Sequence, residues 1–105
     1  MAAEELQTLW CALQALGDPV RLRIIQLLRR REQCVCHLTN LLGLSQGTVS
    51  YHVGVLKRVG LVEDRRDARW TYYRVVPEAV DSVRRYLDEL LDVSQLDPTP
   101  NDCDN

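Results

Sequence analysis

Residues 44–61 read Leu-Ser-Gln-Gly-Thr-Val-Ser-Tyr-His-Val-Gly-Val-Leu-Lys-Arg-Val-Gly-Leu, and this stretch decides the fold. Ser45 is a favoured residue at the start of a helix, and Gly60 is a favoured residue just after one. The apolar residues between them recur at spacings of three and four, which predicts a single stripe on a helix. These stripe residues are Val49, Val53 and Leu56. The other face of the predicted helix is small and polar.

A second helix is expected immediately before this one. Leu38, Leu41 and Leu42 follow a helical spacing, and Gly43 with Leu44 marks the end of that helix. Two helices joined by a short turn that contains glycine form a helix-turn-helix. In such motifs the start of the second helix meets base edges in the major groove of DNA. The candidate DNA contacts are Ser45, Gln46, Thr48, Ser50 and Tyr51.

Two helices are expected ahead of the motif. Residues 4–16 form an amphipathic pattern that ends at Gly17, and residues 20–30 form the next. Asp18 and Pro19 are a helix start signal, because Asp caps the first turn and Pro fits its first position. The core residues expected in the second helix are Leu22, Ile25 and Leu28.

A β-hairpin and a last helix are expected after the motif. Residues 61–63 and 70–76 have strand propensity, and the cationic stretch 65–69 lies between them. Arg66 and Arg69 at this tip are expected to contact backbone phosphates and the minor groove. A helix then begins at Pro77, and its apolar stripe is wide enough to require a partner. These elements together predict a mainly α fold with a small β-hairpin, a winged helix-turn-helix.

Composition sets limits on the domain organisation. The chain has 105 residues, 46% of them hydrophobic, which suits one compact domain over residues 1–93. Residues 94–105 are acidic and poor in apolar side chains, so they are expected to form a flexible tail that carries Cys103. No apolar run approaches the roughly 20 residues of a membrane-spanning helix. A soluble, cytoplasmic protein without a membrane partner is expected.

Charge is distributed unevenly along the chain. The formal net charge is -2, yet residues 20–74 contain eleven basic and four acidic side chains. A basic middle between acidic ends favours nucleic acid at one face of the protein. No phosphate-binding loop and no Ser/His/acid arrangement is evident, so an enzyme is not expected.

Cys34 and Cys36 lie one residue apart at the predicted start of the first motif helix. Clustered thiols in a reducing cytosol are more often metal ligands or sensors than cross-links. Residues two apart on a helix point to nearly opposite sides, whereas on an extended segment they share a face. Either the pair therefore lies where strand becomes helix, or metal binding distorts the first turn. Sulfur ligands select soft ions such as As(III), Sb(III), Cd(II), Pb(II) or Cu(I).

These motifs resemble those of the ArsR/SmtB family of winged-helix metalloregulators, over about residues 6–92. The resemblance is carried by residues 16–22, Cys34-Val35-Cys36-His37-Leu38, residues 44–46 with 60–62, and residues 69–74. It implies a homodimer held by its first and last helices, which binds an inverted repeat in operator DNA and leaves it when metal binds. No permanent cofactor is implied. The Cys-Val-Cys pair resembles the arsenic and antimony branch, so As(III) or Sb(III) is the expected effector.

The resemblance leaves the third metal ligand open. The arsenical pattern has a third cysteine where this chain has Thr39, and an aspartate where it has His37. In the cadmium and lead branch, a cysteine near the N-terminus of the partner subunit completes the site, and Cys11 is in a similar place. Cys103 is the competing donor, and His37 is a less favoured one. A Cd(II)- or Pb(II)-responsive repressor and a thiol-redox-sensing repressor are the alternative functions.

Overall fold

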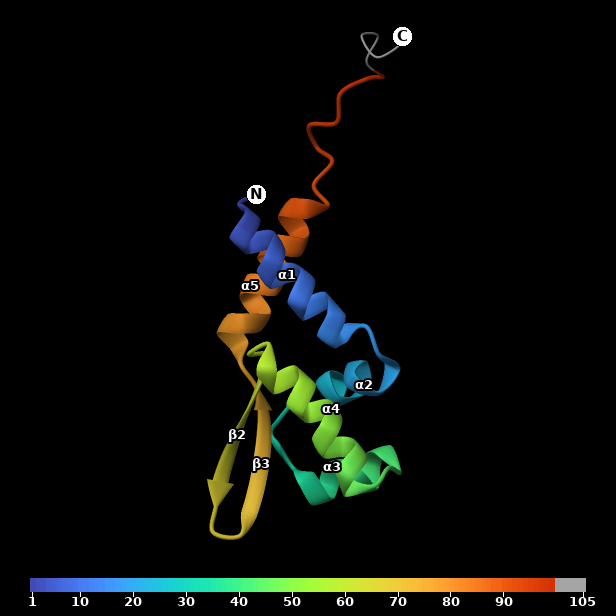
Figure 1. Ribbon diagram of the computed structural model, residues 1–105, viewed down its shortest axis with the longest axis vertical. Helices are drawn as coiled ribbons and strands as arrows, with labels where there is room; N and C mark the ends of the chain where they lie inside the picture. The colour runs from blue at the N-terminus through green and yellow to red at the C-terminus, as the bar shows by residue number, and fades with distance from the viewer. Residues whose placement is uncertain (100–105) are drawn as a thin grey trace.

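The computed structural model describes residues 1–99, which fold into five helices and a three-stranded sheet (Figure 1). In chain order the elements are α1 (Ala3–Leu16), α2 (Pro19–Leu28), β1 (Gln33–Cys34), α3 (Val35–Leu42), α4 (Gln46–Arg58), β2 (Val62–Asp67), β3 (Trp70–Val75) and α5 (Pro77–Leu90). This order confirms the predicted winged helix-turn-helix. The α3 and α4 helices form the motif, and the β2–β3 hairpin extends beside them as the wing.

The predicted start and stop signals of the helices are confirmed. The Asp18 carboxylate accepts hydrogen bonds from the first-turn amides of α2, and Ser45 accepts one from the Thr48 amide at the start of α4. Gly43 and Gly60 follow α3 and α4 with positive φ angles of 67° and 79°. Such angles favour glycine because it has no Cβ.

The sheet is antiparallel, with strand order β1-β3-β2. The predicted strand at residues 61–63 is too short, because β2 continues through residues that were expected in a loop. Arg65 pairs with Tyr72 in the β2–β3 register, and its guanidinium lies 4.7 Å from the ring centroid. Such cross-strand pairs stabilise strands whose charged residues have little strand propensity of their own. Only Ala68 and Arg69 remain in the turn.

One continuous core joins α2, α3 and α4 to the sheet. The predicted stripe of α4 is confirmed, since Val49, Val53 and Leu56 are all buried. Leu38 of α3 is also fully buried, whereas Leu41 is exposed. The other buried apolar residues are Leu9, Ala12, Ala15, Ile24, Leu28, Leu61 and Val62.

The predicted burial of α2 is wrong at one position. Leu22 is 54% exposed, whereas Ile24 is fully buried. Ile24 and Leu28 are one helical turn apart and share the inner face, so Leu22, two residues before Ile24, lies on another face. The helix also ends at Leu28, two residues before the predicted end, and three arginines follow it.

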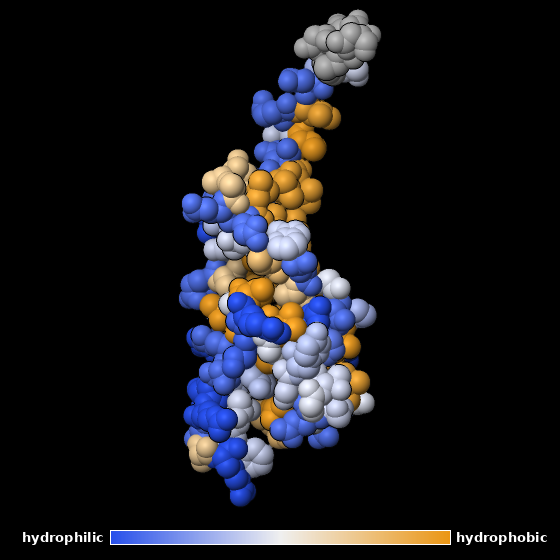
Figure 2. Space-filling model, viewed as in Figure 1, coloured by the Kyte–Doolittle hydropathy of each residue, from blue (hydrophilic) through white to orange (hydrophobic). Residues whose placement is uncertain are grey.

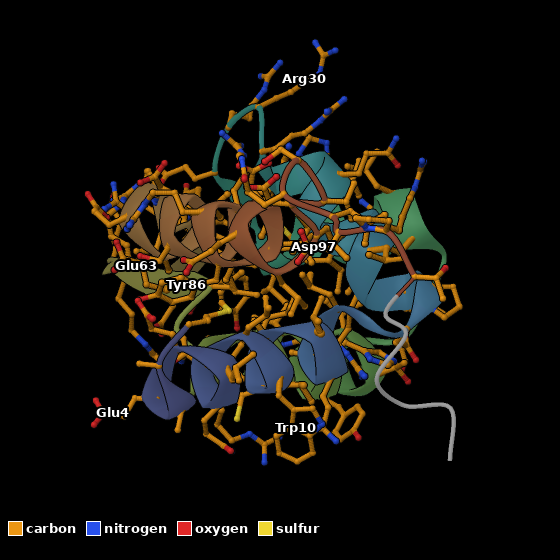
Figure 3. All side chains as sticks on the ribbon, turned by 90° about the horizontal axis from the view of Figure 1, so that it is seen from above. Glu4, Trp10, Arg30, Glu63, Tyr86 and Asp97 are labelled. Atoms are coloured by element: carbon orange, nitrogen blue, oxygen red, sulfur yellow. A yellow bond between two sulfur atoms is a disulfide. The ribbon has the colours of Figure 1, made fainter. Side chains whose placement is uncertain are left out.

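Apolar side chains remain exposed on α1 and α5. Leu6, Trp10 and Leu13 of α1 are at least 40% exposed, and no residue of α5 is fully buried. Trp10 points away from α5, whereas Tyr86 lies between α1 and α5 (Figure 3). Apolar residues also gather on the C-terminal half of α5 and just beyond it, while the wing is hydrophilic (Figure 2). The apolar stripe of α5 was predicted to require a partner, and the exposure of its apolar residues agrees with that prediction.

The chain after α5 runs away from the domain (Figure 1). Residues 94–99 are exposed and belong to no helix or strand. The separate tail over residues 94–105 stays a prediction, and Cys103 lies outside the described residues.

The wing turn generates a stability prediction. Ala68 has a φ of 55°, a left-handed conformation that costs a residue with a Cβ about 1 kcal/mol. Ala68→Gly should therefore raise the free energy of unfolding by about 0.5–1 kcal/mol, after part of the gain is offset by the greater freedom of unfolded glycine. Urea unfolding at fixed protein concentration measures the change.

Ala3→Gly is the matched control, because Ala3 is exposed but begins a helix. It should bring no stabilisation, since glycine lowers helix propensity. An Ala68→Gly protein no more stable than the parent would contradict the assigned turn strain.

Candidate metal centre and DNA-binding surface

The cysteine pair lies where strand becomes helix. Cys34 is the last residue of β1 and the N-cap of α3, with an extended backbone (φ -74°, ψ 156°), and Cys36 is in the first turn of α3. The two Cα atoms are 5.4 Å apart, and the sulfurs are bonded to each other as a disulfide. The first of the two predicted geometries is therefore correct. Because Cys34 is extended, the two sulfurs meet without distortion of the helix.

Cys34 also connects the wing to the helix-turn-helix. Its backbone pairs with Tyr72 of β3, and its sulfur accepts a hydrogen bond from the His37 amide at 3.3 Å. The α3 helix that it caps places Leu38 in the same buried cluster as Val49 and Val53 of α4. Cys34 is therefore joined both to the wing strand β3 and to the helix that packs against α4.

The pair brings two candidate sulfur donors together, without a ready-made third ligand position within residues 1–99. No group of three or more His, Cys, Asp or Glu residues suited to a metal occurs in this part of the chain. Cys11 is half-buried on α1, where its sulfur lies 3.6 Å from Gln7 Nε2. The His37 side chain is exposed next to the pair. The Thr39 hydroxyl, where a third sulfur would lie in the arsenical pattern, donates to the Cys36 carbonyl at 2.7 Å.

An ion pair ties the segment before the cysteines to the wing. Arg65 of β2 donates two hydrogen bonds to the carboxylate of Glu32. This hydrogen bonding is the main cause that lowers the pKa of Glu32 below its usual value. The contact reaches across β3 and links β2 to the residue that precedes β1. Sequence reasoning missed it, because the partners are 33 positions apart.

The predicted DNA contacts are all exposed at the start of α4. Gln46, Thr48, Ser50 and Tyr51 are all exposed, and Tyr51 is 61% exposed. The Ser45 side chain is partly occupied, since it caps α4 and its hydroxyl donates to the Thr48 hydroxyl at 2.9 Å. Gln46 makes no side-chain hydrogen bond within residues 1–99, so its amide is available for a base edge.

The predicted cationic contacts are exposed on the wing. Arg66 extends from β2, and Arg69 in the turn lies over the Trp70 ring, 5.3 Å from its centroid. Lys57 near the end of α4 is instead engaged with Asp64, at 3.2 Å. Arg66 and Arg69 are therefore better placed than Lys57 to contact phosphates.

A polar contact lies beneath α4, the helix whose start is expected to meet DNA and which is called the reader helix here. Sequence reasoning missed this contact. Arg21 Nη1 of α2 lies 3.1 Å from His52 Nδ1 of α4. His52 lies next to the buried stripe of α4, and its side chain is only 12% exposed. The motif Asp18-Pro19-Val20-Arg21 signalled a helix start, but gave no sign of a partner 31 residues away.

The fold, the exposed start of α4 and the cationic wing define a winged helix-turn-helix DNA-binding protein. Residues 18–64 match the family described as bacterial regulatory protein, arsR family. An arsenic resistance transcriptional regulator of Pseudomonas putida is 38% identical over 92 residues, 87% of this chain and 72% of that protein. An uncharacterized HTH-type transcriptional regulator of Methanocaldococcus jannaschii is 37% identical over 78 residues, 73% of this chain and 88% of that protein.

A solved structure of a possible transcriptional regulator for arsenical resistance agrees in fold. It has a TM-score of 0.71 and 34% identity, and the match covers 77% of this chain and 84% of that one. The chain belongs to the arsR family of bacterial regulatory proteins and is a transcriptional repressor of that family. Within residues 1–99, every helix is too short or too polar to cross a membrane.

Proposed function

We propose that the chain is a metal(loid)-responsive repressor that binds operator DNA as an apo homodimer and leaves it when As(III) or Sb(III) binds Cys34 and Cys36. The observation that carries this proposal is the position of the two sulfurs at the β1–α3 junction. Once reduced to thiolates, these two adjacent soft donors suit a soft ion, and they lie at the start of the helix that packs against the reader helix.

The proposed homodimer is supported by the exposed apolar residues of α1 and α5. Leu6, Trp10 and Leu13 occupy one side of α1, and Leu90 and Leu91 are 49% and 65% exposed at the end of α5. Two copies joined through these helices by a two-fold axis would present two reader helices to DNA. Such symmetry requires an inverted repeat, with half-sites about one helical turn or a multiple of it apart.

The proposed coupling follows from the two roles of Cys34. A bound ion imposes its own separation and direction on the two sulfurs, while Cys34 also caps α3 and pairs with β3. An arrangement that suits the ion therefore shifts the start of α3 and the wing together. Metal and DNA affinity must weaken each other by the same factor, with a coupling free energy of about 1–3 kcal/mol in typical cases.

The third donor is proposed to come from elsewhere, because the described part of one chain offers none beside the pair. Cys11 lies on α1, one of the proposed dimer helices, so it is a candidate from the partner subunit. Cys103 is the second candidate, and His37 the third. Cd(II) and Pb(II) also bind sulfur donors, so they are alternative effectors.

The first test is a titration of the reduced protein–DNA complex with As(III), followed by fluorescence anisotropy. As(III) should release DNA from the parent protein. Cys34→Ser and Cys36→Ser should retain DNA, because each leaves only one sulfur at the junction. Cys11→Ser and Cys103→Ser, made singly, should identify the third donor as the one whose loss also prevents release.

The same titration includes a control without As(III) and comparisons with other ions. All four variants should bind DNA without As(III) about as tightly as the parent, which separates the metal step from folding. Release of DNA from the Cys34→Ser and Cys36→Ser proteins by As(III) would refute the proposed metal site. Cd(II) and Pb(II) titrations rank the effectors.

A second prediction separates base reading from phosphate binding. Gln46→Ala should weaken operator binding by about five- to 100-fold with little change on unrelated DNA, because a glutamine amide can pair with adenine. Arg66→Ala should weaken binding to all sequences similarly and reduce the slope of log affinity against log salt by about one. Equal effects of Gln46→Ala on operator and unrelated duplexes would contradict a base contact.

A redox-sensing repressor is the second candidate, and the bonded Cys34 and Cys36 sulfurs favour it. An oxidant such as hydrogen peroxide would accept two electrons and two protons from the thiols and form water. Mass spectrometry of the peroxide-treated protein should show a loss of two hydrogens confined to the peptide with both cysteines. Dithiothreitol should restore the thiols and the original DNA affinity. Free thiols throughout, or unchanged DNA affinity after oxidation, would eliminate this candidate.

A further inference from the structure

Arg21 joins three elements through one side chain. Its Nε donates to the Ala15 carbonyl at the end of α1, and its Nη1 lies 3.1 Å from His52 Nδ1 on α4. A guanidinium has only donors, so Nδ1 of His52 must be the accepting nitrogen in this contact. Arg21 thus holds the His52 ring in one orientation against the end of α1.

Asp18 caps the helix that carries Arg21. Its Oδ1 accepts the Val20 and Arg21 amides at 2.8 and 3.2 Å and lies 3.9 Å from His52 Nδ1. Partial burial acts to raise the pKa of Asp18, but these amide bonds and the nearby charge of Arg21 lower it below its usual value. The carboxylate is therefore ionised, and it lies close to the contact between Arg21 and His52.

The contact between Arg21 and His52 reaches the exposed face of α4 through the next residue. The rings of His52 and Tyr51 meet edge to face, with centroids 5.1 Å apart and an interplanar angle of 68°. His52 is nearly buried, whereas Tyr51 is 61% exposed among the candidate DNA contacts. The His52 ring therefore restricts the orientations that the Tyr51 ring can adopt.

We infer that Arg21 and His52 are positioning residues that orient the Tyr51 ring for DNA recognition and connect that orientation to the end of α1. The inference rests on the proposed function, because it requires Tyr51 to contact operator DNA. It assigns a recognition role to two residues that touch no DNA themselves. If the two residues had a purely structural role, their substitution would change the stability of the fold to the same extent with and without Tyr51.

The test is a double-mutant cycle on the full chain, with a duplex selected from random-sequence DNA by the parent protein. Tyr51→Ala should weaken binding to this duplex about tenfold, and His52→Leu about fivefold, with little change on a scrambled duplex. The double variant should bind no more weakly than Tyr51→Ala alone, because His52 acts through Tyr51. Urea unfolding of all four proteins identifies any change in stability.

Arginine variants provide the matched comparison. Arg21→Lys keeps the charge but loses the fork that reaches both Ala15 and His52, so it should lower discrimination between the two duplexes as His52→Leu does. Arg23→Lys alters the neighbouring exposed arginine, whose contact is with Gln26 on its own helix, and should leave discrimination unchanged. His52→Gln, which retains an acceptor for Arg21 but lacks the ring, should behave like His52→Leu.

The outcomes separate this inference from the proposed function. Additive effects of His52→Leu and Tyr51→Ala, or an equal loss of affinity for the scrambled duplex, would overturn the positioning role while leaving the repressor intact. A Tyr51→Ala protein with parental discrimination would do the same. Failure of the parent chain to select any duplex would overturn both.

Discussion

The change from strand to helix at Cys34 is the constraint on which the candidate switch depends. One residue ends β1, pairs with Tyr72 of the wing and caps the helix that supports α4. A cap residue has an extended backbone while its neighbours are helical, so Cys34 and Cys36 leave the chain in directions that converge. The same pair placed two residues further into α3 would diverge, and one ion could not easily join it. The local backbone therefore brings the two sulfurs together.

Local sequence signals account for most of the fold. Ser45, Asp18 and the glycines after α3 and α4 act within one helical turn, so their effects could be predicted without knowledge of the tertiary structure. The errors occurred where tertiary pairing decides the outcome. Charged residues of β2 have little strand propensity, yet pairing with β3 keeps them extended up to Asp67. Leu22 and Ile24 are both apolar, and only packing against the rest of the core determines which is buried.

The same distinction between local and tertiary interactions applies to the candidate site. The cysteine pair and the polar face of α4 are continuous in sequence, and could be identified from it. The contacts that hold them in place are not continuous: Arg65 reaches Glu32 and Arg21 reaches His52 across more than 30 residues each. Each of these contacts joins an arginine to a partner in a distant part of the chain. Sequence spacing contains no information about such pairs, so the elements of the site were predictable while its internal connections were not.

The exposed apolar residues of α1 and α5 are also relevant to the proposed metal site. A soft three-coordinate ion needs a third sulfur, and α1 carries both Cys11 and the exposed Leu6, Trp10 and Leu13. Association through α1 would therefore decide which thiols from a second copy can approach the Cys34–Cys36 pair. It would also decide how Ala15, which accepts the Arg21 hydrogen bond, is held relative to α4. In the proposed dimer, subunit association, the supply of the third ligand and the orientation of α4 would thus all involve α1, so a change in that helix would affect all three.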